Sequence, residues 1–142
     1  MIVFTVDPDG TQGWYTVDPD GEQRWYKNGV IHRADGPAEI RPDGYQEWWL
    51  NDLCHRTDGP AIIFPNGNQF WLRFGEYHRE DGPAVVRSDG SEEWWINDKL
   101  HREDGPAIIL PDGTQEWWIN DEKINKGKIT INQMKFNIKD GF

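Results

Sequence analysis

Four histidines are all that the chain contains, and they recur every 23 residues, at His32, His55, His78 and His101. Each one opens the same phrase, His-Arg-x-Asp-Gly-Pro-Ala, so an imidazole, a guanidinium and a carboxylate occur together four times. Such side chains can bind a metal ion, bind phosphate or transfer protons. A group that recurs once per repeat more often serves structure, because every unit must make the same contacts with its neighbours.

The spacing of the histidines disfavours a metal site. Successive units of two strands each would lie about 10 Å apart, whereas zinc holds its ligands at about 2 Å. A histidine and the aspartate of the same phrase supply only two ligands. We therefore expect no metal ion and no cofactor, and we expect the imidazole and the aspartate to anchor backbone groups in a wide turn.

The arginines and aspartates of the phrase form two further ladders. We interpret them as ion pairs within or between repeats and as turn ligands, with arginine also stacking on neighbouring indole rings. A phosphate-binding row of arginines is the alternative, and the abundant adjacent carboxylates argue against it. The two ladders are Arg33, Arg56, Arg79 and Arg102, and Asp35, Asp58, Asp81 and Asp104.

Catalysis is not expected from this sequence. Adjacent acids such as Glu92 and Glu93 could suggest glycoside hydrolysis, but neighbouring strand residues point to opposite faces and cannot flank one bond. The chain contains no Gly-rich phosphate loop, no Cys-x-x-Cys motif and no Ser/His/Asp constellation. We therefore expect a binding protein and not an enzyme.

The elements that position these side chains are predicted to be short antiparallel strands. Each unit begins with a turn of the Pro-Asp-Gly type, which is followed by an aromatic pair and an Asn-Gly or Asn-Asp turn. The third unit departs from this pattern, with Trp71-Leu72 and Phe74-Gly75 at these positions. In Pro-Asp-Gly, proline presets φ, aspartate binds its own backbone and glycine supplies a positive φ, which fits a hairpin loop. No segment shows a sustained 3.6-residue period. The predicted fold is therefore all-β, an elongated single-layer antiparallel sheet of 23-residue hairpin repeats with two main strands per unit.

A chain of 142 residues is long enough for one domain. We expect an N-terminal half-repeat cap over residues 1–18, repeats over 19–121 and a divergent C-terminal capping hairpin over 122–142, where lysines would protect the sheet edge. The single cysteine, Cys54, takes the position of a core residue in other units, excludes an internal disulfide and fits a cytoplasmic location. We expect neither a signal peptide nor a membrane-spanning segment.

The net charge of the chain is unevenly distributed. Residues 1–121 contain 23 acids and 10 lysines plus arginines, a net charge of −13, whereas residues 122–142 contribute +3. The acidic body should repel nucleic acid and anionic membranes, so neither is expected as a direct partner. A protein partner is expected instead, and the charge favours a basic or nucleic-acid-handling one.

A doubled aromatic recurs along the chain, with Trp71-Leu72 as the exception, and it places an aromatic column on both faces of the sheet. If Arg41 and Tyr45 flank the loop, Ile40 lies opposite Gln46, and Ala38 would then lie opposite a tryptophan. The uniform column, interpreted as the structural face, is Trp25, Trp48, Trp71, Trp94 and Trp117. The other face carries the candidate binding residues Tyr26, Trp49, Trp95, Trp118, Glu47, Glu93 and Glu116. Either the sheet curls so that both columns are core, or the second is an exposed stripe for a partner or a homodimer.

The spacing of an aromatic residue, Asn-Gly and histidine resembles the MORN repeat. It occurs here as Tyr26-Lys27-Asn28-Gly29-Val30-Ile31-His32, and the resemblance covers about residues 14–121. It implies a twisted single-layer sheet of hairpins with binding or scaffolding roles. The chain departs from MORN units in having arginine after each histidine and no glycine two residues before the second aromatic. The variant phrase resembles that of uncharacterised repeat proteins of bacteria, their phages and large DNA viruses.

Three functions compete at this point. The first is a non-catalytic protein-binding or self-associating repeat module that uses the aromatic and acidic face. The second is an acidic viral or phage inhibitor that mimics nucleic acid and blocks a host defence protein. The third is a small-ligand binder in which a nucleotide or a sugar stacks on tryptophan.

Overall fold

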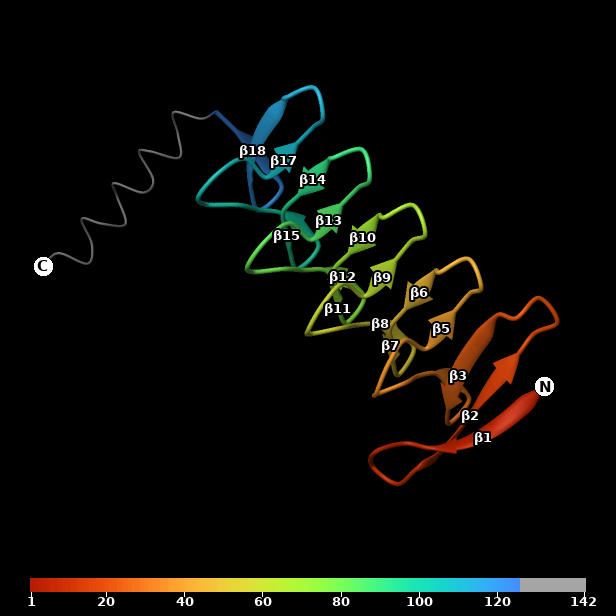
Figure 1. Ribbon diagram of the computed structural model, residues 1–142. Coiled ribbons are helices and arrows are strands. Elements are labelled where there is room, and N and C mark those ends of the chain that lie inside the picture. The colour runs from red at the N-terminus through yellow and green to blue at the C-terminus, as the bar shows by residue number, and fades with distance from the viewer. Residues whose placement is uncertain (126–142) are drawn as a thin grey trace, which may run out of the picture.

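The computed structural model describes residues 1–125, and this part of the chain contains only strands, turns and loops. The units follow one another along a single axis, so the molecule is elongated, with the N-terminal hairpin at one end and β18 at the other (Figure 1). Residues 126–142, which include most of the predicted capping hairpin, lie outside the described residues. No helix among the described residues is long and apolar enough to cross a membrane.

Thirteen strands form one open antiparallel sheet, which confirms the elongated single-layer sheet predicted from the sequence. The strands follow chain order across the sheet except that β4 pairs only with β3. They are β1 (Ile2–Val6), β2 (Gln12–Val17), β3 (Gln23–Lys27), β4 (Val30–Ile31), β5 (Glu39–Ile40), β6 (Gln46–Glu47), β9 (Ile62–Ile63), β10 (Gln69–Phe70), β13 (Val85–Val86), β14 (Glu92–Glu93), β17 (Ile108–Ile109), β18 (Gln115–Ile119) and β19 (Glu122–Ile124).

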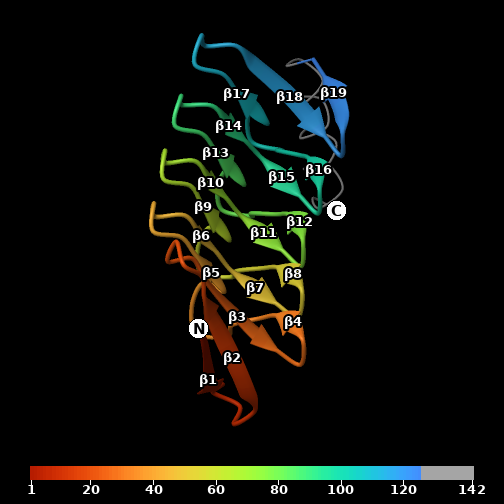
Figure 2. The same cartoon turned by 90° about the vertical axis from the view of Figure 1, so that its right-hand side faces the viewer.

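Three small hairpins form a second row beside the principal sheet (Figure 2). They pair β7 (Trp49–Leu50) with β8 (Leu53–Cys54), β11 (Leu72–Arg73) with β12 (Glu76–Tyr77), and β15 (Trp95–Ile96) with β16 (Lys99–Leu100). Each central unit thus has four two-residue strands where the sequence predicted two longer ones.

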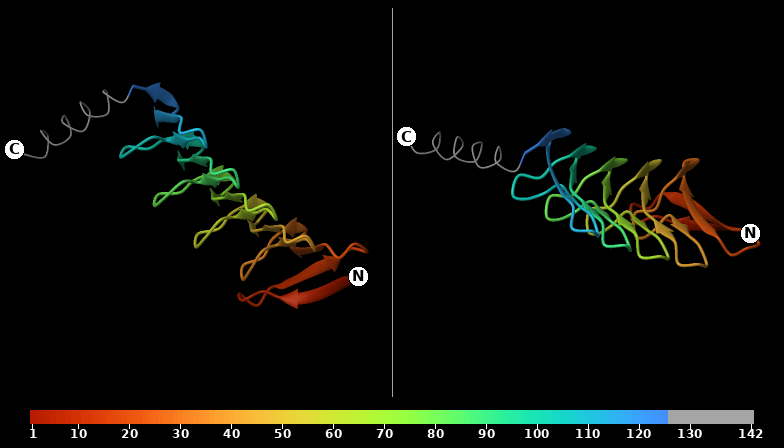
Figure 3. Two further views of the ribbon diagram at one scale, coloured as in Figure 1. Left: turned by 45° about the horizontal axis from the view of Figure 1, so that its top comes forward. Right: turned by 90° about the horizontal axis from the view of Figure 1, so that it is seen from above.

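The first tryptophan of each aromatic pair separates the two rows. The backbone N–H of Trp48 donates to the carbonyl of Ala61 at 2.8 Å, and its carbonyl accepts from the N–H of His55 at 2.9 Å. The chain therefore leaves the principal sheet between β6 and β7. The same break recurs at Trp71 and Trp94, whereas β3 and β18 continue through the equivalent tryptophans Trp25 and Trp117. The hairpins and loops of the central units repeat with a constant offset along the axis (Figure 3).

The turns have the chemistry that the sequence predicts. In the Pro-Asp-Gly loop, the N–H of Arg41 donates to the carbonyl of Tyr45 at 3.0 Å, and the Oδ1 atom of Asp43 accepts from the N–H of Tyr45 at 2.9 Å. Gly44 supplies the positive φ, at 98°. The second turn has positive φ at both central residues, 48° at Asn51 and 66° at Asp52, which is the type I′ hairpin turn.

The register confirms that Ile40 lies opposite Gln46. The ladder ends at the next pair, Glu39 and Glu47, so the predicted pairing of Ala38 with Trp48 does not form. Instead, Ala38 donates its N–H to the carbonyl of Glu47 at 2.8 Å. The alanine of each phrase is completely buried, which leaves no room for a larger side chain; this ladder comprises Ala38, Ala61, Ala84 and Ala107.

A hydrophobic core cluster lies between the principal sheet and the small hairpins. Cys54, Ala61 and Leu72 form its centre, and Trp49 and Phe70 are among the residues that pack around them. Burial raises the pKa of the Cys54 thiol far above its usual range. Cys54 is therefore a small core residue, as the repeat alignment predicts, and its thiol is inert at neutral pH.

Candidate functional site

The arginine of each phrase lies between an indole ring and a glycine. The Cζ atom of Arg56 is 3.9 Å from the ring centroid of Trp48, within the range of a cation–π interaction. On the opposite side, a Cβ atom added to Gly59 would lie 2.9 Å from the same Cζ. The bare backbone of the glycine in Asp-Gly-Pro therefore allows this close approach, and a side chain at that position would force the guanidinium to shift. The other three pairs have the same stacking, at 4.0–4.1 Å: Arg33 on Trp25, Arg79 on Trp71 and Arg102 on Trp94.

Two hydrogen bonds fix each guanidinium in this position. The Nε atom of Arg56 donates to the Oδ1 atom of Asp58 at 2.8 Å, and its NH1 group donates to the carbonyl of Pro60 at 3.1 Å. The hydrogen bond from Arg56 also lowers the pKa of Asp58. The structure thereby confirms the predicted ion pairs within repeats and the stacking of arginine on indoles. The aspartate accepts its hydrogen bond from the arginine side chain. The arginine acts as the predicted turn ligand through its hydrogen bond to the proline carbonyl.

The histidine ladder joins each unit to the next one. The Nδ1 atom of His32 accepts a hydrogen bond from the N–H of Asn51, and that of His55 accepts from the N–H of Phe74, both at 3.0 Å. A ring nitrogen that accepts a hydrogen bond carries no proton, so Nδ1 is the acceptor nitrogen in both rings. Burial lowers the pKa of His55, and the nearby Arg73 lowers it further. The predicted anchoring of backbone by imidazole is confirmed, but the turn that it anchors belongs to the following unit.

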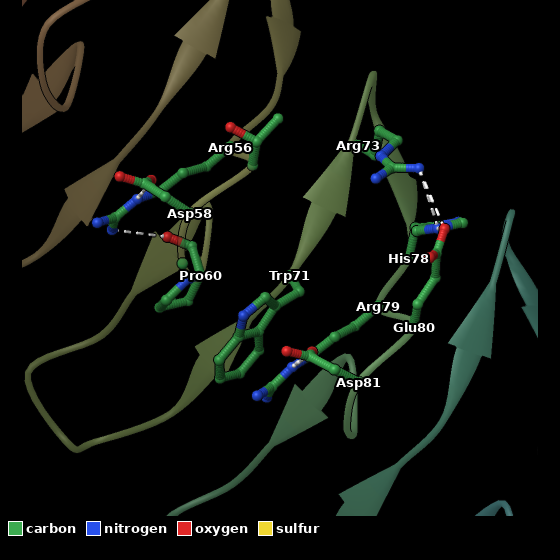
Figure 4. A pocket seen from close by; sticks show the side chains of 11 residues that line it. Arg56, Asp58, Pro60, Trp71, Arg73, His78, Arg79, Glu80 and Asp81 are labelled. Carbon is green, nitrogen blue, oxygen red and sulfur yellow. Dashed lines mark hydrogen bonds and ion pairs between the residues drawn. The ribbon is translucent and has the colours of Figure 1, made fainter.

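Clefts open between successive Asp-Gly-Pro loops along one edge of the molecule. The central cleft, of about 620 Å³, has Trp71 as its floor, Arg56 to Pro60 as one wall and His78 to Asp81 as the other (Figure 4). Equivalent clefts precede and follow it, with volumes of about 610 and 680 Å³. Their floors are the corresponding tryptophans, Trp48 and Trp94. The repeat therefore places three similar clefts in a row.

The variable residue of the phrase lies at the rim of these clefts. It is Ala34, Thr57, Glu80 and Glu103 in the four units, and each lines at least one cleft. The different residues at this position change the charge along the row of clefts. The first cleft has two arginines and two aspartates, whereas the third has two arginines and four carboxylates. The row thus becomes more acidic toward the C-terminal unit.

The residues that the sequence suggested for binding do not form an open stripe. Glu47 is only 9% exposed and accepts a hydrogen bond of 2.7 Å from the hydroxyl of Tyr45. Trp49 packs against the core cluster, and Tyr26 stacks on Trp14 with 5.9 Å between ring centroids. The expectation of an exposed Glu47 is wrong, because the small hairpins fold against this face of the sheet.

The remaining members of this set are held by hydrogen bonds and ion pairs to neighbouring side chains. The indole Nε1 of Trp95 donates to Glu93 at 2.9 Å, and that of Trp118 donates to Glu116 at 3.0 Å. Glu93 also pairs with Arg87, and Glu116 pairs with Lys123. Three members of the first aromatic column, which the sequence indicated as structural, line the clefts: Trp48, Trp71 and Trp94. The variable position next to an invariant Arg and Asp was the sequence signal that could have indicated this.

The four histidines do not join a cluster of three metal-ligand side chains among the described residues. The one cluster found there consists of Asp18, Asp20 and Glu22, at the first Pro-Asp-Gly turn. Glu22 already accepts hydrogen bonds from Arg24 at 2.7 Å and from Arg41 at 3.3 Å. Asp18 also lies 3.9 Å from Arg24, so two of the three acids of this turn are paired with arginine.

In comparisons with protein-family models, with curated proteins and with solved structures, none matched the chain. The resemblance to MORN repeats therefore rests on the residues quoted above. The geometry of the clefts is the basis on which function can be argued.

Proposed function

We propose that this protein is a non-catalytic repeat module that binds an extended segment of a partner protein along the row of clefts. The observation that carries the proposal is the repetition itself: three clefts of similar volume, each with a tryptophan floor, lie on one edge. A single small ligand would need one cleft, whereas an extended chain can occupy all three. Multiple weak contacts in register would then add to a specific affinity.

The spacing of the clefts supports a ligand in the polyproline II conformation. Each unit contributes two strands to the principal sheet, so equivalent clefts repeat about every 9.6 Å. A polyproline II helix rises about 3.1 Å per residue with three residues per turn, or about 9.3 Å per turn. Every third side chain of such a segment therefore meets the next cleft. Aromatic-lined grooves are the usual recognition surface for this conformation.

Charge supports a basic segment. Residues 1–121 have a net charge of −13, and the third cleft has twice as many carboxylates as guanidiniums. We propose that a lysine or arginine of the partner enters this third cleft, next to Glu80 and Asp104. The single cysteine, buried and free, supports a reducing compartment such as the cytoplasm as the place of action.

The test is a titration with synthetic proline-rich peptides of about 12 residues that carry lysine at every third position. Quenching or enhancement of tryptophan fluorescence would report binding. A peptide of equal composition with lysine at every second position is the ligand control. We expect the first peptide to bind at least ten times more tightly than the second. Equal affinities would show that only net charge is recognised and would contradict the proposal.

A pair of variants locates the binding site. Thr57→Arg places a cation at the rim shared by the first two clefts, and Ser88→Arg makes the same charge change on the opposite, Pro-Asp-Gly edge. Thr57→Arg should weaken peptide binding by about tenfold, the equivalent of 1.4 kcal/mol, while Ser88→Arg should leave it within about twofold. Equal effects of both variants would place the site elsewhere.

The acidic-inhibitor function remains an alternative with less support from the clefts. Duplex DNA carries one charge per about 1.7 Å of its axis, whereas the aspartate ladder offers one carboxylate per unit, each paired with an arginine. Binding of a basic nucleic-acid-handling protein that collapses with added salt would favour mimicry. Binding of a free nucleotide or sugar, with loss of peptide binding, would favour the small-ligand alternative.

A further inference from the structure

Exposed large apolar side chains are concentrated on the first strand. Among the described residues, seven large hydrophobic side chains are exposed, and four of them belong to the segment Met1 to Val6. Ile2, Phe4 and Val6 are 63%, 79% and 70% exposed. Since alternate residues of a strand share a face, these three side chains form one apolar row along β1.

The backbone of the same three residues points away from the rest of the sheet. Met1 and Val17 exchange hydrogen bonds in both directions at 2.8 Å, and Asp7 donates to Thr11 at 2.8 Å. In an antiparallel pair, bonded and non-bonded residues alternate. Ile2, Phe4 and Val6 therefore direct their N–H and C=O groups to the outer edge, where no strand of the described chain lies. This edge carries neither a lysine nor a proline, the residues that usually prevent strands from pairing.

Phe4 also ends an aromatic row that runs into the sheet. It lies opposite Trp14, and Trp14 lies opposite Tyr26 and stacks on it. The row is packed at Tyr26 and open at Phe4. A further aromatic side chain placed across the edge from Phe4 would continue it.

We infer that the β1 edge pairs with the β1 edge of a second copy of this chain, antiparallel and centred on Phe4. In this register Phe4 faces Phe4 of the partner copy, Ile2 faces Val6, and each pair exchanges both of its backbone hydrogen bonds. The apolar row of one copy meets the same row of the other, and the two sheets become one. The inference is independent of the clefts, which lie along a different edge.

The absence of charged side chains on β1 favours a second copy of this chain over a basic partner at this edge. β1 has no charged side chain, so it offers no carboxylate for a basic segment to bind. It is also the place where two copies of a chain with a net charge of −10 can approach without opposing their acids. Pairing of one short strand buries on the order of 800 Å² in total, which corresponds to a weak, reversible dimer.

Sedimentation velocity of the full chain between about 10 µM and 1 mM tests the inference. We expect a concentration-dependent shift from monomer to dimer, with a dissociation constant on the order of 100 µM. Phe4→Lys should leave the protein monomeric throughout this range. Phe74→Lys is the matched control, because Phe74 is also exposed, at 60%, but lies in a turn between β11 and β12. It should dimerise like the parent chain.

Hydrogen exchange gives a second readout that does not depend on a variant. The amides of Ile2, Phe4 and Val6 should exchange rapidly in dilute protein and slowly in concentrated protein, while that of Val3, already bonded to β2, should not change. A monomer at 1 mM would overturn the inference. So would equal loss of dimer in both variants, or open-ended assembly instead of a closed dimer.

Discussion

The Nδ1 atom of His55 accepts a hydrogen bond of 3.0 Å from the backbone N–H of Phe74, 19 residues further along the chain. The two rings also lie against each other, with centroids 4.2 Å apart. This contact ties the second unit to the third, and it requires a neutral imidazole. The stability of the stack therefore depends on the protonation state of His55.

Stability should fall as the pH drops below about 6.5, the ordinary value for histidine. The pKa of His55 is lowered in the folded protein, chiefly by burial. The unfolded chain therefore takes up the proton first, so the contribution of His55 is complete above its unfolded pKa and is lost as pH decreases. Urea unfolding at pH 7.5, 6.5 and 5.5 would measure it. His55→Asn, which keeps an acceptor but does not titrate, should show a smaller pH dependence; an unchanged dependence would contradict this role.

Gly59→Ala should destabilise the protein by about 1–3 kcal/mol, the usual cost of overpacking. The added Cβ would lie 2.9 Å from the Cζ of Arg56, which is held by Trp48, Asp58 and the carbonyl of Pro60. Thr57→Ala in the same loop is the control, because that side chain is exposed. Thermal unfolding of both variants would show the difference. If the two unfolded at the same temperature, the guanidinium would have to be free to move.

Tyr45→Phe should cost about 1–3 kcal/mol, because it removes a donor from a buried carboxylate. The Tyr45 hydroxyl donates to Glu47 at 2.7 Å, and both residues are buried. Burial and the same hydrogen bond raise the pKa of Tyr45. The double variant Tyr45→Phe/Glu47→Gln should lose less unfolding free energy than the two single variants lose together. A double-mutant cycle measured by urea unfolding would show this. Additive effects would mean that the two groups do not interact.

Phe74→Asn should raise the stability by about 0.5–1 kcal/mol. Phe74 has a φ of 49°, a left-handed conformation that is unfavourable for a bulky residue and readily adopted by asparagine. Asn28, Asn51, Asn97 and Asn120 occupy this position in the other units. Differential scanning calorimetry would measure the change. A lower melting temperature would mean that stacking of Phe74 on His55 outweighs the backbone strain.

The sequence predicted the repeat, the turns and the sheet because each is encoded locally. The glycine and asparagine positions in the turns are local requirements for positive φ, and the pairing of Ile40 with Gln46 follows from the loop length. The division of the predicted strand between β6 and β7 could not be seen. It depends on the hydrogen bonds that Trp48 donates to Ala61 and accepts from His55. Both bonds join residues that are not adjacent in the sequence.

The location of the candidate site was predicted only in part. The Arg, Asp and Trp ladders were identified, and their contacts within each unit agree with the stacking expected from residue type. The covering of Glu47 and Trp49 by the small hairpins could not be predicted, since alternation along a strand does not specify which face is packed. The clefts depend on the separation of successive loops, which is a property of the assembled stack.

The most direct test of the binding clefts is an NMR titration that follows the indole N–H signals of the tryptophans as the proline-rich, lysine-containing peptide is added. The signals of Trp48, Trp71 and Trp94, which form the floors of the clefts, should shift together and saturate at one peptide per chain. The signals of Trp49, Trp95 and Trp118 should remain in place. Shifts confined to this second set, or no shift at all, would contradict the assignment of function to the clefts.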